Sequence, residues 1–142
     1  VLVITGIIFF SLPSFSFFKY YQQVQDSKWI DLNTVNINDY IQNDEVVFVD
    51  ITADWCATCQ FNKINVLNSS IIQEIFNKQN IVKVRGDWTK SNKNIENFLQ
   101  EHNRFGIPFN VIYSKSYPNG IILSELLTNK EIIETIEKII EN

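Results

Sequence analysis

The sequence has 142 residues, of which 45% are hydrophobic and 20% charged, a composition typical of one globular domain and not of a disordered chain. Its formal net charge is −4, and it contains no run of Lys and Arg. Because neutralising phosphates needs clustered basic side chains, nucleic-acid binding is not expected.

Residues 1–18, VLVITGIIFFSLPSFSFF, contain no charged side chain and are rich in Val, Ile, Leu and Phe. About 20 apolar residues span a bilayer as a helix, so we expect a transmembrane segment or the C-terminal part of one. Pro13 would kink such a helix, which membrane helices tolerate. The alternatives are the apolar region of a signal peptide or a buried helix. The first two interpretations place the following residues outside the cytoplasm.

Residues 19–44 follow, and we expect a polar linker and an N-terminal extension. The extension contains a short strand in WIDL, residues 29–32, and a brief helix in NINDYIQND, residues 36–44. EVVFVDIT, residues 45–52, is a continuous apolar run rich in Val and Ile. Such a run is typical of a strand buried on both faces, so the main domain is predicted to begin there.

Helices and strands then alternate to the end of the chain. Further elements are predicted as helices at 56–67, 69–79, 91–105 and 129–140, and as strands at 80–88, 106–114 and 121–126. YPNG, residues 117–120, predicts a turn between the last two strands. This order predicts one α/β domain over residues 45–142, with a mixed central sheet of four or five strands flanked by helices and preceded by the apolar N-terminal helix.

The chain has two cysteines, Cys56 and Cys59, and both lie in DITADWCATCQ, residues 50–60. A structural zinc site needs four ligands, and the chain adds one histidine, His102, which shares an apolar helix face with Leu99 and is assigned to packing. A copper site built from the same three residues is a minor alternative. A structural disulfide would close too short a loop to stabilise the fold much. We therefore predict no metal and no cofactor.

A redox-active dithiol is the favoured interpretation. The predicted strand 45–52 leads into a helix that begins near Cys56, where unpaired backbone N–H groups favour a thiolate. Cys59 follows one turn inward, within reach of a mixed disulfide on Cys56. Two cysteines at this spacing between a strand and a helix strongly indicate a redox-active pair. Cys56 is predicted to be the exposed nucleophile and Cys59 the buried resolving thiol.

Two acids and an aromatic residue lie close to the cysteines in the sequence. Asp50 stands in the apolar strand, where burial would favour its neutral form, so it is a candidate to take the proton from Cys59. The alternative is that Asp50 points to water. Asp54 is a candidate for tuning the thiols, or else a solvated loop acid. Trp55 either shields the dithiol and contacts the substrate, or simply packs.

Pro108, in GIPF, is the second landmark of the sequence. Nearly all cis peptide bonds precede proline, and a cis bond between Ile107 and Pro108 would turn the backbone of Ile107 toward an extended partner chain. That chain could then add as a strand. A trans turn is the alternative. Ile107 and Pro108 are therefore predicted to contact the substrate.

These features together resemble the thioredoxin superfamily over residues 45–142: a strand carrying Asp50, then WCATC, then the loop with Pro108. A closer resemblance is to the C-terminal periplasmic thioredoxin-like domain of the DsbD family of thiol:disulfide interchange proteins. It is carried by ADWCATC, by GDWTKSNKNIENFLQEHNRFGIPFNVIYS and by LSELLTNKEIIETIEK. An apolar N-terminal segment fits a domain that follows a transmembrane helix.

The resemblance implies a protein-disulfide reductase held at the bacterial inner membrane, with its domain in the periplasm. In that family a membrane dithiol relay passes electrons to this domain. The domain then reduces periplasmic thiol–disulfide proteins and serves cytochrome c maturation. Cys56 and Cys59 would carry the electrons, and Asp50 matches the buried acid. The chain departs from the family pattern at two places. Residues 57–58 are Ala-Thr, where thioredoxin has Gly-Pro, and Gln60 stands where a Lys is common. The alternatives are a stand-alone anchored thioredoxin-like protein of cytochrome c maturation, and a non-catalytic or metal-chaperone module.

Overall fold

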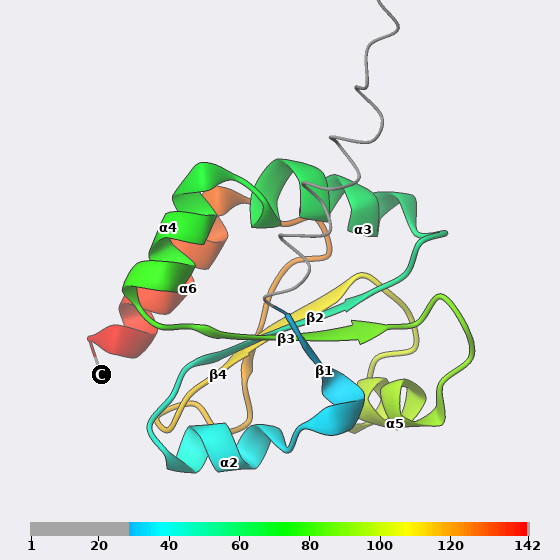
Figure 1. Cartoon of the computed structure of the whole chain (residues 1–142), viewed down its shortest axis with the longest axis horizontal. Helices are drawn as coiled ribbons and strands as arrows, with labels where there is room; N and C mark the ends of the chain where they lie inside the picture. Colours follow the sequence, from blue (N-terminus) through cyan, green and yellow to red (C-terminus); the bar gives the residue numbers. More distant parts are fainter. Residues whose placement is uncertain (1–28, 142) are drawn as a thin grey trace, which may run out of the picture.

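The computed structural model describes residues 29–141, so the predicted transmembrane segment at 1–18 and the linker at 19–28 lie outside the described residues. Figure 1 shows a central sheet with helices on both of its faces. The sheet has five strands in the order β1-β3-β2-β4-β5. The strands are β1 (Ile30–Asp31), β2 (Val47–Thr52), β3 (Val82–Asp87), β4 (Phe109–Tyr113) and β5 (Ile121–Ile122). Strands β1, β3 and β2 are parallel, while β4 and β5 are antiparallel to their neighbours, which confirms the predicted mixed α/β sheet.

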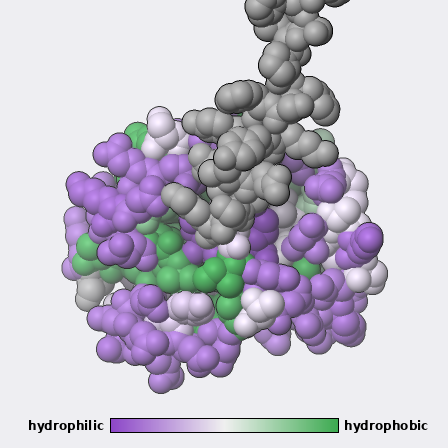
Figure 2. Space-filling view, in the orientation of Figure 1, coloured by the Kyte–Doolittle hydropathy of each residue, from purple (hydrophilic) through white to green (hydrophobic). Residues whose placement is uncertain are grey.

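Helices α3, α4 and α6 cover one face of the sheet, and α2 and α5 cover the other (Figure 1). The helical elements are η1 (Leu32–Thr34), α2 (Ile37–Gln42), α3 (Ala57–Asn62), the π-helix η2 (Lys63–Leu67), α4 (Ser70–Lys78), α5 (Lys93–Glu101) and α6 (Asn129–Ile140). The surface seen in Figure 2 is mostly hydrophilic, with hydrophobic residues in a band between the helices of the two layers. Among residues 29–141 no helix has the length and apolar character needed to cross a bilayer.

Strand β2 runs through the centre of the sheet, and all six of its residues are buried. Because side chains alternate along a strand, Phe48 and Asp50 face one helical layer while Val49 and Ile51 face the other. Phe48 packs in a core with residues of η2, α4 and α6, whereas Val49 and Ile51 pack in a second core with residues of α2 and α5. Asp50 therefore lies on the face of the sheet that α3 covers.

Residues 29–42 belong to the same fold, although the sequence suggested an extension ahead of the domain. Strand β1 pairs in parallel with β3 and forms the edge of the sheet. Ile41 of α2 is 6% exposed and joins the core that contains Val49. The sheet thus needs residues upstream of position 45 to be complete.

Several predicted elements differ from the structure. The helix expected at 91–105 ends at Glu101, and the strand expected at 106–114 begins at Phe109. The helix expected at 56–67 changes at Lys63 from α3 into the π-helix η2. The strand expected at 121–126 consists of Ile121 and Ile122 alone. The N–H of Leu123 still donates to the carbonyl of Asn110 on β4, but the side chain of Asn62 bonds to the backbone of Glu125 and Leu127, so those two residues are bonded to α3 and not to a strand.

Replacing Asn62 by alanine is expected to lower the free energy of unfolding by about 2 kcal/mol, because two backbone groups lose their partners and the N–H of Leu127 is buried. Asn62 is 1% exposed, its Nδ2 donates to the carbonyl of Glu125 at 2.8 Å, and its Oδ1 accepts from the N–H of Leu127 at 3.1 Å. Urea denaturation measures the loss. The matched control is Asn65→Ala on the same helical stretch, an exposed site where the change should cost less than about 0.5 kcal/mol. Equal losses at the two positions would contradict this assignment.

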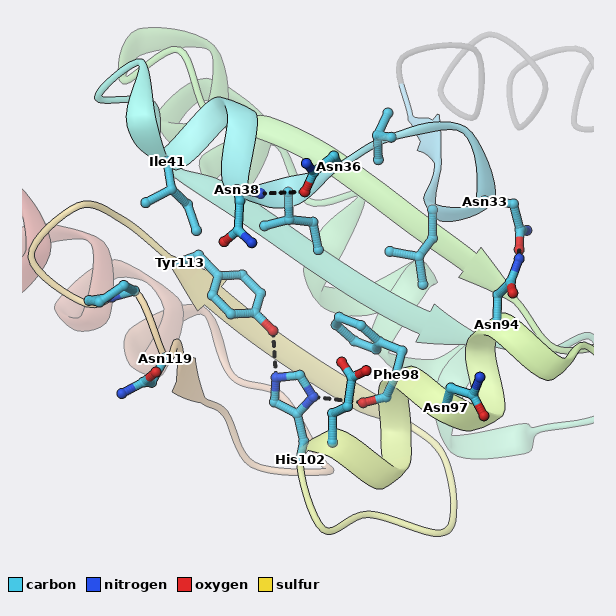
Figure 3. Close-up of a pocket in the computed structure, with 15 residues that line it drawn as sticks. Asn33, Asn36, Asn38, Ile41, Asn94, Asn97, Phe98, His102, Tyr113 and Asn119 are labelled. Atoms are coloured by element: carbon cyan, nitrogen blue, oxygen red, sulfur yellow. Dashed lines mark hydrogen bonds between the residues drawn. The ribbon is translucent and has the colours of Figure 1, made fainter.

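His102 packs among aromatic rings, which confirms its assignment to packing. Its ring centroid lies 4.7 Å from that of Phe98 and 5.2 Å from that of Phe109. Nδ1 bonds to the carbonyl of Phe98 at 2.7 Å, and because a carbonyl only accepts, Nδ1 carries the hydrogen. In the neutral ring Nε2 is then an acceptor for the hydroxyl of Tyr113, as drawn in Figure 3.

Burial raises the pKa of Tyr113 well above its ordinary value, and the negative charge of Glu101 adds to this effect. A tyrosine whose pKa is raised by folding stays protonated in the fold while the unfolded chain ionises, so its stabilising contribution is present below pH 10 and is lost as the pH rises above it. Above pH 10 we expect the free energy of unfolding to fall, through this group, by about 1.4 kcal/mol per pH unit. Denaturation curves at pH 9, 10 and 11 should show a shallower decline for Tyr113→Phe, and parallel declines would contradict the prediction.

Candidate functional site

Cys56 and Cys59 form a disulfide at the start of α3. Strand β2 ends at Thr52, and Cys56 occupies the capping position directly before the first residue of α3. The backbone N–H of Cys59 points back and donates to the Sγ of Cys56, at an N to S distance of 3.2 Å. The structure therefore confirms the predicted place of Cys56 at a helix N-terminus, and this N–H is a ready donor to the anion that reduction would leave on that sulfur.

The two sulfurs are more enclosed than the sequence suggested. Cys56 is 7% exposed and Cys59 is 3% exposed. Ala53 and Ile107 pack against them and cover the disulfide from two sides. The prediction of an exposed Cys56 is therefore wrong for the disulfide form, although Cys56 keeps more open surface than Cys59.

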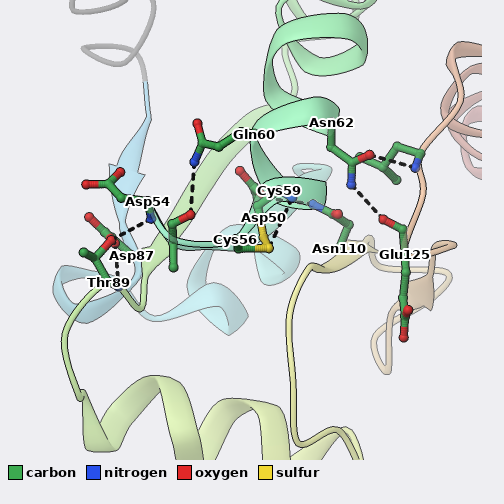
Figure 4. Close-up of a disulfide and its surroundings, with 12 residues drawn as sticks. Asp50, Asp54, Cys56, Cys59, Gln60, Asn62, Asp87, Thr89, Asn110 and Glu125 are labelled. Carbon is green, nitrogen blue, oxygen red and sulfur yellow. Dashed lines mark hydrogen bonds between the residues drawn. A yellow bond between two sulfur atoms is a disulfide. The ribbon is translucent and has the colours of Figure 1, made fainter.

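Asp50 is buried, with 4% of its surface exposed, and it lies among the residues around the disulfide (Figure 4). Asp50 does not point to water, so that alternative is wrong. Its carboxylate has two partners that the sequence did not reveal: the Nε of Arg85 donates to Oδ2 at 3.0 Å, and the Nδ2 of Asn110 donates to Oδ1 at 3.0 Å. Both partners stand directly opposite Asp50 on the neighbouring strands β3 and β4. A polar row thus crosses three strands beneath α3.

Arg85 is itself covered. Its side chain is 11% exposed, and its guanidinium carbon lies 4.0 Å from the ring centroid of Trp29, a cation–π contact. A cavity of about 390 Å³ opens beside this pair, and Gln60 and Lys63 from the cysteine-bearing helical stretch line its other side. Arg85, the cation of the buried ion pair, therefore borders a space that solvent can enter, and Gln60, the neighbour of Cys59 in the sequence, lines the same space.

Asp54 and Trp55 both lie in the exposed loop before Cys56. The backbone N–H of Asp54 donates to the hydroxyl of Thr89 at 2.9 Å, and Asp54 also lines the cavity beside Arg85. Trp55 is 62% exposed, and its ring contacts that of Trp88 at 6.4 Å between centroids. Tuning of the thiols by Asp54 and substrate contact by Trp55 both stay predictions.

The loop before β4 completes the site. The peptide bond between Ile107 and Pro108 is cis, Ile107 packs against the two cysteines, and Pro108 is buried. Substrate contact by these two residues stays a prediction. Phe105, at 82% exposed, and Leu126, at 56%, are large apolar side chains open to solvent that the sequence analysis missed, because isolated aromatic and aliphatic residues in loops carry no periodic signal.

A second cavity, larger than the one beside Arg85, lies on the other face of the sheet. It measures about 760 Å³ and is lined by residues of α2 and α5, with His102 and Tyr113 at its wall (Figure 3). The cysteines are not among its lining residues, and volume is therefore no guide to the chemistry of this fold. Within residues 29–141 no group of three or more His, Cys, Asp and Glu side chains is placed to hold a metal ion.

Comparison with known proteins agrees with this geometry. Residues 41–115 match a family model described as thioredoxin-like. The oxidised C-terminal domain of DsbD from Neisseria meningitidis is 18% identical, with a TM-score of 0.58 over 86% of this chain and 95% of that one. A thioredoxin from Thermus thermophilus is 12% identical, with a TM-score of 0.59 over 80% and 86%, and thioredoxin NaTrxh from Nicotiana alata is 17% identical, with a TM-score of 0.56 over 79% and 92%. No curated protein sequence matches the chain. At these identities the structural likeness establishes the fold.

Proposed function

This chain belongs to the thioredoxin-like family and carries the Cys56–Cys59 pair of a thiol–disulfide oxidoreductase, and on that premise we propose that it is a membrane-tethered reductase of protein disulfides. The observation that carries the proposal is the sulfur pair at the start of α3, where the backbone N–H of Cys59 donates to the Sγ of Cys56 and the carboxylate of Asp50 lies nearby. This arrangement provides a nucleophile, a resolving thiol and a base.

The reaction begins with both cysteines reduced. The Cys56 thiolate attacks one sulfur of a partner disulfide, and the other partner sulfur leaves as a thiolate and takes up a proton. Cys59 then gives its proton to the Asp50 carboxylate and attacks Cys56, which forms the Cys56–Cys59 bond and releases the second partner sulfur as a thiolate. That thiolate takes up a proton from water, and Asp50 returns its proton to water. Two electrons pass to the partner, whose disulfide becomes two thiols. A membrane dithiol then reduces the Cys56–Cys59 disulfide back to two thiols and is itself oxidised to a disulfide.

The proposal also covers where the domain is located and in which direction electrons flow through it. The apolar stretch 1–18 supports a tether in the bacterial inner membrane with the domain on the periplasmic side. The likeness to the DsbD C-terminal domain, solved in both oxidised and reduced forms, supports a relay in which this domain receives electrons from a membrane dithiol and passes them to periplasmic thiol–disulfide proteins. The same tether and fold also suit a stand-alone protein of cytochrome c maturation, so the partner decides between them.

Redox titration of the full chain tests the proposal. The chain is equilibrated with mixtures of reduced and oxidised dithiothreitol, and free thiols are alkylated and counted by mass spectrometry. We expect a reversible two-electron couple on the order of −270 mV, the reducing range in which thioredoxin works. A chain that shows no reversible couple, or that instead holds copper tightly through its two cysteines, would refute the reductase and favour the metal-chaperone alternative.

A further inference from the structure

We infer that Asn110 is a positioning residue of the reaction, because its side-chain N–H bonds to the Asp50 carboxylate oxygen that accepts the proton of Cys59. The inference rests on the proposed function, in which Asp50 acts as the base. Asn110 lies on β4, far from the cysteines in the sequence. Only the folded sheet brings it next to Asp50.

The two oxygens of Asp50 are held from opposite sides. Arg85 donates to Oδ2 from β3, and Asn110 donates to Oδ1 from β4, each at 3.0 Å. A proton on Oδ2 would weaken the charge-assisted bond from Arg85, whereas Oδ1 accepts from a neutral amide, so Oδ1, the oxygen bound by Asn110, takes the proton of Cys59 at the lower cost. Because a donor to the ionised form stabilises that form, Asn110 sets how readily Oδ1 is protonated.

Asn110 has little reason to be present other than this bond. It interrupts the apolar strand β4 (Phe109–Tyr113), and asparagine is disfavoured in strands. It is 1% exposed, and its Oδ1 is buried with no hydrogen-bond partner. A buried carbonyl without a partner costs free energy. The side chain therefore gains a partner through Nδ2 alone, and that partner is Asp50.

The other charged and titratable groups near Asp50 lie at different distances from its carboxylate and are expected to affect it to different degrees. Arg85 on β3 is bonded to Asp50 at 3.0 Å, and the two cysteines at the start of α3 lie near it (Figure 4). Charged residues around the adjacent cavity lie further out, at the border with solvent: Asp31, Asp54, Lys63 and Asp87. Asn110 is the neutral group in direct contact with the carboxylate, so it can be replaced without a change of net charge.

The test compares Asn110→Thr with Asn110→Val, which have nearly the same shape and differ in one hydroxyl donor. The reduced full chain is mixed with 5,5′-dithiobis(2-nitrobenzoate), an aromatic disulfide. The first equivalent of coloured thiolate reports attack by Cys56, and the second reports resolution by Cys59. For Asn110→Val we expect the pH at which resolution is half maximal to rise by about one unit, which slows resolution about tenfold on the acid side. Asn110→Thr should stay within about threefold of the wild type.

Controls separate this inference from its premise. In an Asp50→Asn background the Thr and Val variants should have the same pH profile, and a difference that persists there would overturn the inference. Identical profiles for the wild type, Thr and Val variants would also overturn it while the reductase assignment stands, whereas a wild type that never releases the second equivalent would refute the proposed function itself. If Asn110→Val does not fold, Asn110→Ala compared with Asn110→Ser poses the same question.

Discussion

A Cys59→Ser chain is expected to stop halfway through the reaction, with its Cys56 sulfur joined covalently to a partner sulfur. Steady-state reduction of a protein disulfide such as insulin should fall at least about a thousandfold, because serine cannot displace a thiolate from a disulfide. The mixed disulfide should accumulate instead. A non-reducing gel followed by mass spectrometry detects the adduct, which dithiothreitol should release.

Cys56→Ser is the matched control for this experiment. This substitution also replaces one sulfur by oxygen, at the other cysteine of the pair. It should abolish both turnover and the adduct, because the remaining thiol of Cys59 is the more deeply buried of the two, at 3% exposed. An adduct on Cys56→Ser together with none on Cys59→Ser would reverse the two roles. The identity of the trapped partner also distinguishes a membrane relay from a cytochrome c maturation pathway.

Replacing Gly120 by alanine is expected to lower the free energy of unfolding by about 3 kcal/mol, the largest loss of stability predicted for this fold. Gly120 ends the turn at residues 117–120 and has a φ of +78°, a conformation that residues with a Cβ disfavour. An added Cβ would overlap the Cγ2 of Val111 and lie 2.8 Å from the Cε1 of Tyr113. Strain and overpacking therefore act together.

Gly106→Ala is the control for this prediction, and urea denaturation of both variants is the measurement. A Cβ at Gly106 would meet no atom within 4 Å, and Gly120 is the only glycine in the described residues with a positive φ. Gly106→Ala should therefore stay within about 0.5 kcal/mol of the wild type. If Gly120→Ala is equally mild, the turn repacks and the close contact with Val111 is not limiting.

Local signals in the sequence were sufficient to place the two cysteines. The apolar run at 45–52 predicted a buried strand, and β2 is buried over its whole length. The short segment between this strand and the next predicted helix left Cys56 at a helix start, where the structure has it. Hydrophobic periodicity and a two-residue spacing act over a few residues, so both can be recognised without knowing the fold.

The partners of Asp50 could not be found in that way. Arg85 is 35 residues from Asp50 in the sequence and Asn110 is 60 residues away. Their alignment depends on the register of β3 and β4 against β2, and a shift of one residue in either strand would turn the side chain to the opposite face. The sequence predicted an acid within an apolar strand and close to Cys59, whereas the register also gives it a cation on one side and an amide on the other.

The ends of elements were the least predictable feature. Residues 123–126 carry enough apolar side chains to suggest a strand, yet Asn62 bonds to the backbone of Glu125 and so holds that stretch against α3. A single buried amide thus overrides the local propensity of several residues. Strand β1 was expected at nearly its observed position, but its role as the parallel neighbour of β3 depends on the tertiary fold.

The indole of Trp29 sets a practical limit on how far the protein can be shortened. A truncated version that starts at residue 45, or one restricted to the family-matched stretch 41–115, would keep both cysteines and Asp50. It would nevertheless lack the aromatic lid at 4.0 Å from the guanidinium of Arg85 and leave that cation facing water, where its attraction for Asp50 is screened. The smallest unit that keeps this ion pair covered therefore begins no later than Trp29, upstream of the boundary that sequence similarity alone would choose.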